Sequence, residues 1–241
     1  MSRILEVLNL KIRYREKNNL NTIVNGISFE ISEGEILGLV GPSGCGKSST
    51  ALSIVGLLPE NSECEGSIIY NGRDISRLDI NEMRKIRGKD ISFVFQEPQS
   101  ALNPLIKVGK QISEPLLIHF PDLNKKDIYD KVITSMKNVG LNDAENIYGK
   151  YPHQMSGGMC QRAVIAMALV CSPKLIILDE PTTALDVVTQ KQILELLKNI
   201  NKTMGTAMLF ISHNNAVIDY ICERKKTMRD GIFTETEEFD G

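Results

Sequence analysis

The sequence lacks any long apolar run. Residues 163–171 form one of the longest, and a membrane-spanning helix needs roughly 18 or more such residues. The first residues, Met-Ser-Arg-Ile-Leu-Glu, also lack the apolar segment of a secretory signal peptide. We therefore expect a chain that neither crosses a membrane nor is exported.

Cysteine is scarce, and its spacing indicates no metal site. The five cysteines are odd in number and show no C-x-x-C pair, so neither a disulfide framework nor a zinc site is indicated. This usage is typical of a reduced, cytoplasmic compartment.

An excess of positive charge is absent as well. The formal net charge is −2, and the basic residues form only short clusters, at 84–89 and 224–226. Because nucleic-acid-binding surfaces are generally strongly basic, we expect no nucleic-acid partner. The sequence shows no internal repeat, and its 241 residues, 42% of them hydrophobic, suit one or two domains with a substantial core.

What the sequence does contain is a complete phosphate-binding loop at residues 41–48, Gly-Pro-Ser-Gly-Cys-Gly-Lys-Ser. It follows the apolar run 36–40 and precedes the apolar stretch 50–58, which is the strand–loop–helix context that this motif requires. Backbone N–H groups and the helix start attract phosphate oxygens. Lys47 can reach the β- and γ-phosphates, and Ser48 can ligate Mg²⁺. The alternative is a plain glycine-rich turn.

The apolar pattern predicts an α/β core interrupted by helices. We expect strands at 5–14, 27–31, 36–40, 67–70 and 91–95, with a polar tip at 15–21 and a first helix that stops at Pro59. Residues 97–165 show helical patterns broken by prolines, including Pro115. The later runs 175–178 and 207–212 are typical of strands buried on both faces of a parallel sheet. Between them, residues 188–204 predict an amphipathic helix.

Two carboxylates follow the apolar run 175–178. Asp179 and Glu180 would lie at the carboxyl edge of the sheet, where ligands bind in open α/β folds. We expect Asp179 to hold Mg²⁺ through its water shell and Glu180 to polarise the attacking water. An acidic turn is the alternative, and the phosphate loop upstream favours the catalytic interpretation.

A second helix start at 155–159 resembles an anion-binding site. Ser156 is suited to capping the apolar helix that follows, over 163–171. Gly157 and Gly158 leave the first N–H groups uncovered. A plain capping motif would explain the serine but not the two glycines.

Taken together and in this order, these segments resemble the nucleotide-binding subunit of an ATP-binding cassette (ABC) transporter over nearly the whole chain. Residues 41–48 match the Walker A motif, 175–180 match Walker B, and 155–159 resemble the Leu-Ser-Gly-Gly-Gln signature with Met at both ends. The remaining matches are the Q-loop residue Gln96, the D-loop Ala184-Leu185-Asp186, the switch residue His213 and the adenine-stacking residue Tyr14.

The resemblance implies one ABC ATPase domain over residues 1–241. Its fold class is α/β, a P-loop NTPase core (a mostly parallel sheet with helices on both faces) plus an antiparallel β subdomain and an inserted α-helical subdomain. The nucleotide-binding core and β subdomain would comprise 1–96 and 166–241, and the signature-containing helical subdomain 97–165.

The resemblance also implies a set of site residues. The catalytic residues would be Glu180, His213, Gln96 and Lys47, and the Mg²⁺ ligands Ser48, Gln96 and Asp179. The ATP-binding residues would be Tyr14, Gly41, Pro42, Ser43, Gly44, Cys45, Gly46, Lys47, Ser48, Ser49, Ser156, Gly157, Gly158 and Asp186.

In this family the two phosphate-binding helix starts meet across a head-to-tail dimer. The resemblance implies that Lys47 and its neighbours face the γ-phosphate from one subunit, and that Ser156 and Gly158 of a second ABC ATPase subunit close the site, in a homodimer or a heterodimer. Two ATP molecules are then buried between the subunits, and loss of the γ-phosphate releases them.

The segment 95–104 and Tyr151-Pro152-His153-Gln154 resemble bacterial importers of oligopeptides, dipeptides and nickel. This implies a permease pair, an extracytoplasmic binding protein, and a peripheral location on the cytoplasmic face of the membrane. The permease would dock on residues 97–150. The chain stops at Gly241 without the cysteine cluster of peptide-importing relatives, so its length suits a nickel or metal-chelate branch, or a truncated peptide-type subunit.

Three positions depart from the family pattern. Cys160 stands where a basic residue is usual, Thr183 replaces a common Ser, and the charged segment 223–229 replaces an apolar strand. We expect that segment to be a charged edge strand, a less stable terminus or a segment that needs a partner subunit. Within the phosphate loop, we expect alkylation of Cys45 to block ATP binding and ATP to protect it; an inert filler side chain is the alternative.

A second function class is a soluble ABC ATPase that acts as a nucleotide-gated clamp in translation or DNA maintenance. Such proteins usually carry tandem cassettes, coiled coils or zinc modules, and these do not fit into 241 residues.

Overall fold

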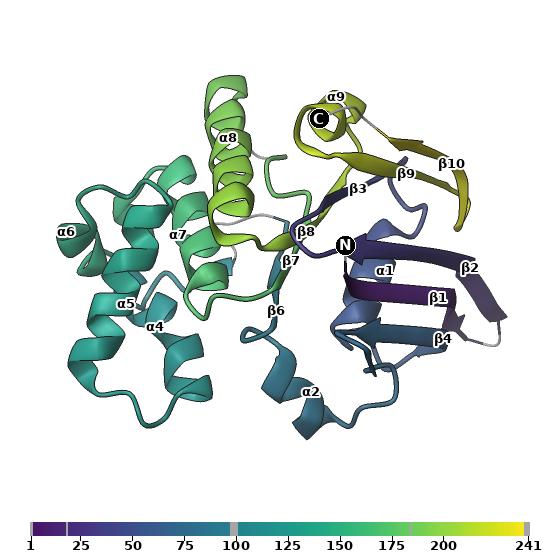
Figure 1. Cartoon of the computed structure of the whole chain (residues 1–241), viewed down its shortest axis with the longest axis horizontal. Coiled ribbons are helices and arrows are strands. Elements are labelled where there is room, and N and C mark those ends of the chain that lie inside the picture. Colours follow the sequence, from purple (N-terminus) through teal and green to yellow (C-terminus); the bar gives the residue numbers. More distant parts are fainter. Residues whose placement is uncertain (1, 18, 97–100, 184, 239–241) are drawn as a thin grey trace. The chain divides into compact units, whose positions relative to one another are not determined.

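The structure, a computed structural model, describes residues 2–17, 19–96, 101–183 and 185–238. It divides into two compact units, one formed by Met1–Arg84 and Gly205–Gly241, the other by Lys85–Met204. Figure 1 labels their helices and strands. Within the described residues, no helix combines the length and apolarity that a membrane crossing requires. The predicted subdomain boundaries at 96/97 and 165/166 stay a prediction.

The first unit contains an antiparallel sheet in the order β2-β1-β4-β5, of which Figure 1 labels β2, β1 and β4. Its strands are β1 (Arg3–Glu16), β2 (Asn19–Ser32), β4 (Ser62–Tyr70) and β5 (Arg73–Asp74). The predicted polar tip at 15–21 was too long, because β1 continues to Glu16 and β2 restarts at Asn19. Ion pairs of Arg13 and Arg15 with glutamates of β4 hold these polar strand ends in the sheet.

The same unit contains a group of parallel strands. β3 (Ile36–Val40) lies between β8 (Ala207–Ser212) and β9 (Arg224–Arg229), and β10 (Ile232–Glu238) pairs antiparallel with β9. Every residue of β3 and β8 is buried, as the apolar runs predicted. Helix α1 (Lys47–Ile54) contacts β2, and α9 (Asn215–Ile221) packs on β3 and β8.

The expectation of a charged edge strand was wrong. β9 has β3 on one side and β10 on the other, so both of its edges are paired. Arg224 donates to Glu35 Oε1 from Nε at 2.9 Å, and its Nη2 donates to the Glu30 carbonyl oxygen at 2.8 Å. Met228 on the same strand is fully buried. Long-range partners therefore allow a charged sequence to occupy an interior strand.

The second unit combines two parallel strands with helices. β6 (Ile91–Val94) pairs with β7 (Leu175–Asp179), and α7 (Gly157–Leu169) packs on β6. The other elements are α4 (Val108–His119), α5 (Lys125–Asn138), α6 (Ala144–Tyr148), the short 3₁₀ helix η1 (Pro152–Gln154) and α8 (Val187–Met204). Helices α4, α5, α6 and α7 pack against one another, and α2 (Ile80–Ile86) precedes β6.

One expected helix breaker lies within a helix. Pro115 was predicted to interrupt the helical pattern, but it lies inside α4. The buried face formed by Val108, Ile112 and Leu116 supplies the packing that offsets the missing N–H bond.

Candidate nucleotide-binding site

The phosphate loop joins β3 to α1 in the first unit. Gly46, immediately before α1, has φ 110°, a conformation that residues with a side chain rarely adopt. A Cβ added there would lie 2.8 Å from both the Ile23 carbonyl oxygen and Met228 Cε. The tight turn and the close packing therefore require glycine at this position.

Lys47, the first residue of α1, is 5% exposed, and its ammonium group turns back over the loop. Nζ donates to the carbonyl oxygens of Gly41 at 2.8 Å and Pro42 at 2.9 Å. The helix start has no side-chain cap, and its first turn contains no acidic residue. A buried cation beside uncapped backbone N–H groups fits the phosphates of a nucleotide.

Tyr14 lies beside this helix. Its hydroxyl donates to Ser49 Oγ at 3.0 Å, which joins β1 to the first turn of α1. Ser48, one residue earlier, is exposed. Stacking of Tyr14 on adenine stays a prediction. The sequence did not indicate the hydrogen bond between Tyr14 and Ser49.

Cys45 is buried within the loop, with 6% of its surface exposed. Its sulfur lies 3.9 Å from Lys47 Nζ. The predicted effect of alkylation stays a prediction. Because Cys64 in the same unit is exposed, that thiol provides an internal comparison for the reaction.

His213 follows β8 at the same strand end as the phosphate loop. Val40, which precedes Gly41, is the pairing partner of Ser212, which precedes His213. The sequence motifs for Walker A and the switch histidine are therefore brought to one end of a parallel strand pair.

The second unit carries the predicted catalytic carboxylates. Asp179 is the last residue of β7 and is 8% exposed. Glu180 has φ 48°, a left-handed conformation that is strained for a residue with a side chain. Thr183 Oγ1 donates to Glu180 Oε2 at 2.9 Å, and Gln96 Nε2 approaches the same oxygen at 3.4 Å. The structure thus brings the predicted Q-loop residue and the predicted base together.

Thr183 is a site residue that the sequence did not reveal. The sequence shows Thr183 only as a replacement for a common Ser, and its position three residues after Glu180 does not by itself indicate a hydrogen bond to that carboxylate. Residues 97–100 of the Q-loop and Ala184 of the D-loop lie outside the described residues.

The signature segment starts α7 as predicted. Ser156 Oγ accepts a hydrogen bond from the Met159 N–H at 3.3 Å. The helix begins at Gly157, earlier than the apolar run suggested, because the capping serine and the glycines form its first turn. Cys160 is buried, and its sulfur contacts the Pro152 carbonyl oxygen at 3.6 Å.

Asp186, predicted to bind nucleotide, lies at the start of α8. Its carboxylate accepts hydrogen bonds from the backbone N–H groups of Val188 and Thr189 and from the Thr189 hydroxyl. The Thr189 hydroxyl, followed by the Thr189 N–H, lowers the pKa of Asp186. A role for Asp186 in nucleotide binding stays a prediction.

The predicted Mg²⁺ ligands are oxygen donors. Within the described part of the chain, no three His, Cys, Asp or Glu side chains cluster as a metal site. The hydroxyl of Ser48, the amide of Gln96 and the carboxylate of Asp179 suit Mg²⁺, which keeps several waters and is shared with substrate phosphates. The chemistry of these donors therefore fits this ion.

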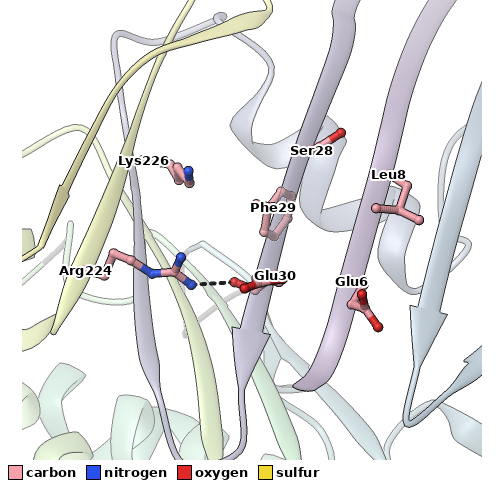
Figure 2. Close-up of a pocket in the computed structure, with 7 residues that line it drawn as sticks. All are labelled: Glu6, Leu8, Ser28, Phe29, Glu30, Arg224 and Lys226. Carbon is pink, nitrogen blue, oxygen red and sulfur yellow. Dashed lines mark hydrogen bonds between the residues drawn. The ribbon is translucent and has the colours of Figure 1, made fainter. Parts of the chain in front are cut away.

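A separate pocket of about 270 Å³ lies in the first unit (Figure 2). Its lining comes from β1, β2 and β9, and Arg224 donates to the Glu30 carbonyl there. None of the residues predicted to bind nucleotide lines it.

Comparison with known proteins identifies related sequences and folds. The profile of a family described as ABC transporter matches residues 24–183. The oligopeptide transport ATP-binding protein OppD of Haemophilus influenzae is 42% identical over 96% of this chain and 71% of its own length. The dipeptide transport ATP-binding protein DppD of Bacillus subtilis is 44% identical over 98% of this chain and 70% of its own length.

A solved structure is similar over the whole chain. The dimeric ATP-binding cassette MJ0796, in a post-hydrolysis state bound to ADP and Pi, has a TM-score of 0.86 at 30% identity. The match covers 98% of this chain and 99% of that one. The predicted α/β fold class is therefore confirmed.

Proposed function

Because the chain belongs to the ABC transporter family and is one of its ATPases, we propose that it is the ATP-hydrolysing motor subunit of a bacterial peptide importer. The observation that supports the cargo class is the identity of 42–44% with oligopeptide and dipeptide transport proteins over almost the whole chain. Nickel or a metal chelate, the alternative cargo, stays a prediction.

The mechanism begins with binding of ATP at the phosphate loop. The loop N–H groups and Lys47 hold the phosphates, and Tyr14 stacks on the adenine. Ser48, Gln96 and Asp179 would hold Mg²⁺, which neutralises charge that develops on the phosphate oxygens. Lys47 exchanges its carbonyl partners for phosphate oxygens, a charge-assisted and stronger interaction.

Hydrolysis requires a base for the attacking water. Glu180 takes this role, and the hydrogen bonds from Thr183 and Gln96 to one of its oxygens fix its orientation. The other carboxylate oxygen accepts the proton of the water. His213 contacts the γ-phosphate from the end of β8.

A second ABC ATPase subunit, identical or different, completes each site. In a second copy of this chain, Ser156, Gly157 and Gly158 would present the capped start of α7 to the γ-phosphate, where the helix dipole favours negative charge. Two ATP molecules are enclosed in this way, and loss of the γ-phosphate favours separation. The dimeric state of the similar cassette bound to ADP and Pi supports this arrangement.

The permease docks on the second unit, at the cytoplasmic face of the membrane. The apolar side chains of Leu105, Leu117 and Ile118 are 84%, 55% and 71% exposed, on or just before α4. Large exposed apolar side chains commonly mark protein contact surfaces. They fall within residues 97–150, which the sequence assigned to this contact. An extracytoplasmic binding protein would act through the permease.

Purification from the native membrane in detergent tests this function. We expect the tagged chain to co-isolate with a multi-span membrane protein, and the reconstituted complex to take up labelled oligopeptide into vesicles when ATP is supplied. Association with ribosomes or DNA would instead support the nucleotide-gated clamp and contradict the importer. Uptake of nickel but not of peptide would contradict the cargo alone.

A further inference from the structure

At the start of α8, the side chain of Thr189 contacts two segments of the proposed interface at once. Its hydroxyl donates to Asp186 Oδ2 at 2.6 Å. Its methyl group lies against the signature glycine, since a Cβ added at Gly158 would be 2.8 Å from Thr189 Cγ2. That separation is shorter than van der Waals contact, so α7 and α8 approach this closely only because residue 158 is glycine.

The two contacts of Thr189 depend on a single torsion angle. Threonine is branched at Cβ, and one χ1 rotation places both its hydroxyl and its methyl group. The Asp186 carboxylate is itself held, because its Oδ1 accepts the N–H groups of Val188 at 3.1 Å and Thr189 at 3.0 Å. A hydroxyl bound to this fixed carboxylate therefore fixes the methyl group against Gly158.

The first turn of α8 is also bonded to the loop that carries the proposed base. Gln190 Nε2 donates to Thr182 Oγ1 at 3.0 Å, and Thr182 is 5% exposed. The next residue, Thr183, donates to Glu180. The neighbouring residues Thr182 and Thr183 thus link the first turn of α8, which contains Thr189, to Glu180 through one hydrogen bond each.

We propose that Thr189 is a positioning residue that holds the signature glycine Gly158 and the D-loop residue Asp186 in one fixed arrangement. The two segments then engage the second ATPase subunit and its ATP together. The proposal rests on the proposed function, in which two ATPase subunits enclose ATP. Thr189 acts through its two neighbours and touches no reacting atom.

Two substitutions separate the two contacts. Thr189→Val removes the hydroxyl and keeps the branched shape, whereas Thr189→Ser keeps the hydroxyl and removes the methyl group. Thr203→Val is the matched control, because Thr203 lies in the last turn of the same helix and its hydroxyl donates to carbonyl oxygens of that helix, those of Asn199 and Ile200. All three are made in a Glu180→Gln background, where hydrolysis does not obscure assembly.

The readout is the ATP concentration that gives half-maximal dimer, measured by light scattering. We expect both Thr189 substitutions to raise it about fivefold, the effect of losing one ordinary contact, while Thr203→Val leaves it unchanged. ATP binding to the dilute monomer, which reports on the phosphate loop, stays unchanged in all variants.

Three results would overturn the proposal. If the Thr189 variants melt at a lower temperature but dimerise at the parent's ATP concentration, Thr189 only stabilises the fold. If Thr189→Val alone has an effect, the contact with Gly158 plays no part in positioning. If the parent Glu180→Gln protein fails to dimerise at saturating ATP both alone and with the second ATPase subunit that co-isolates with it, the two-subunit site of the proposed function fails, and the role of Thr189 fails with it.

Discussion

At the scale of single residues, Glu180 combines a strained backbone with a carboxylate held by two donors. Its φ of 48° costs roughly 1–3 kcal/mol, and such strain concentrates at functional sites. Its position after a buried strand was predictable, because a run of apolar residues that ends in a carboxylate is a local pattern. The two donors, Thr183 and Gln96, were not predictable, because no sequence pattern indicates which hydroxyl or amide will reach the Glu180 carboxylate.

We expect Glu180→Gln to bind ATP as well as the native chain and to hydrolyse it at least about 100-fold more slowly, the usual contribution of a general base. The uncharged amide cannot accept the water proton, so the ATP-bound dimer accumulates. Phosphate release at saturating ATP and dimer formation by light scattering measure the two effects.

The control for this substitution is Glu33→Gln, which changes an exposed carboxylate in a turn. Its hydrolysis rate should equal that of the native chain. Normal turnover in the Glu180→Gln protein would remove Glu180 as the base.

At the scale of elements, β9 shows how a charged sequence forms an interior strand. Arg224 and Glu35 form a mostly buried ion pair, with side chains 20% and 9% exposed. Glu35 also accepts the Ser32 N–H at 2.7 Å. Met228 on this strand packs beneath the phosphate loop, since Cβ atoms added at Gly41 or Gly46 would collide with it. β9 therefore packs directly against the phosphate loop.

Arg224→Ala is expected to lower the free energy of unfolding by about 3 kcal/mol, because it leaves the Glu35 carboxylate buried without its partner. Chemical denaturation followed by circular dichroism measures the change. We expect Arg73→Ala to cost less than about 1 kcal/mol, since the Arg73–Glu82 pair is 60% and 43% exposed. Equal losses in the two variants would show that the Arg224 pair contributes no more than a surface pair.

At the scale of the whole molecule, the predicted nucleotide-binding residues are divided between the two units. The phosphate loop and His213 belong to the first unit, whereas the carboxylates, the signature and α4 belong to the second. In the proposed importer, the permease contact and the signature would therefore belong to the same unit.

Ile118→Asp should abolish at least about 90% of the stimulation of hydrolysis by the permease, because a carboxylate buried in an apolar contact is costly. Dimer formation with ATP should not change. Hydrolysis rates with and without the permease in detergent provide the measurement. Ile80→Asp is the matched control, since Ile80 is 59% exposed in the first unit. Full stimulation in Ile118→Asp, or equal loss in both variants, would contradict docking at α4.

The sequence by itself determined the family and the α/β fold class, and its short motifs predicted the site residues. Phosphate binding depends on groups only a few residues apart, as in the loop before Lys47 and the cap at Ser156, so short motifs encode it. Only the tertiary structure decided that β9 is an interior strand and that the Thr189 methyl group packs against Gly158. These outcomes depend on partners far apart along the chain, such as Arg224 and Glu35, 189 residues apart, and local sequence patterns do not encode which distant groups will meet.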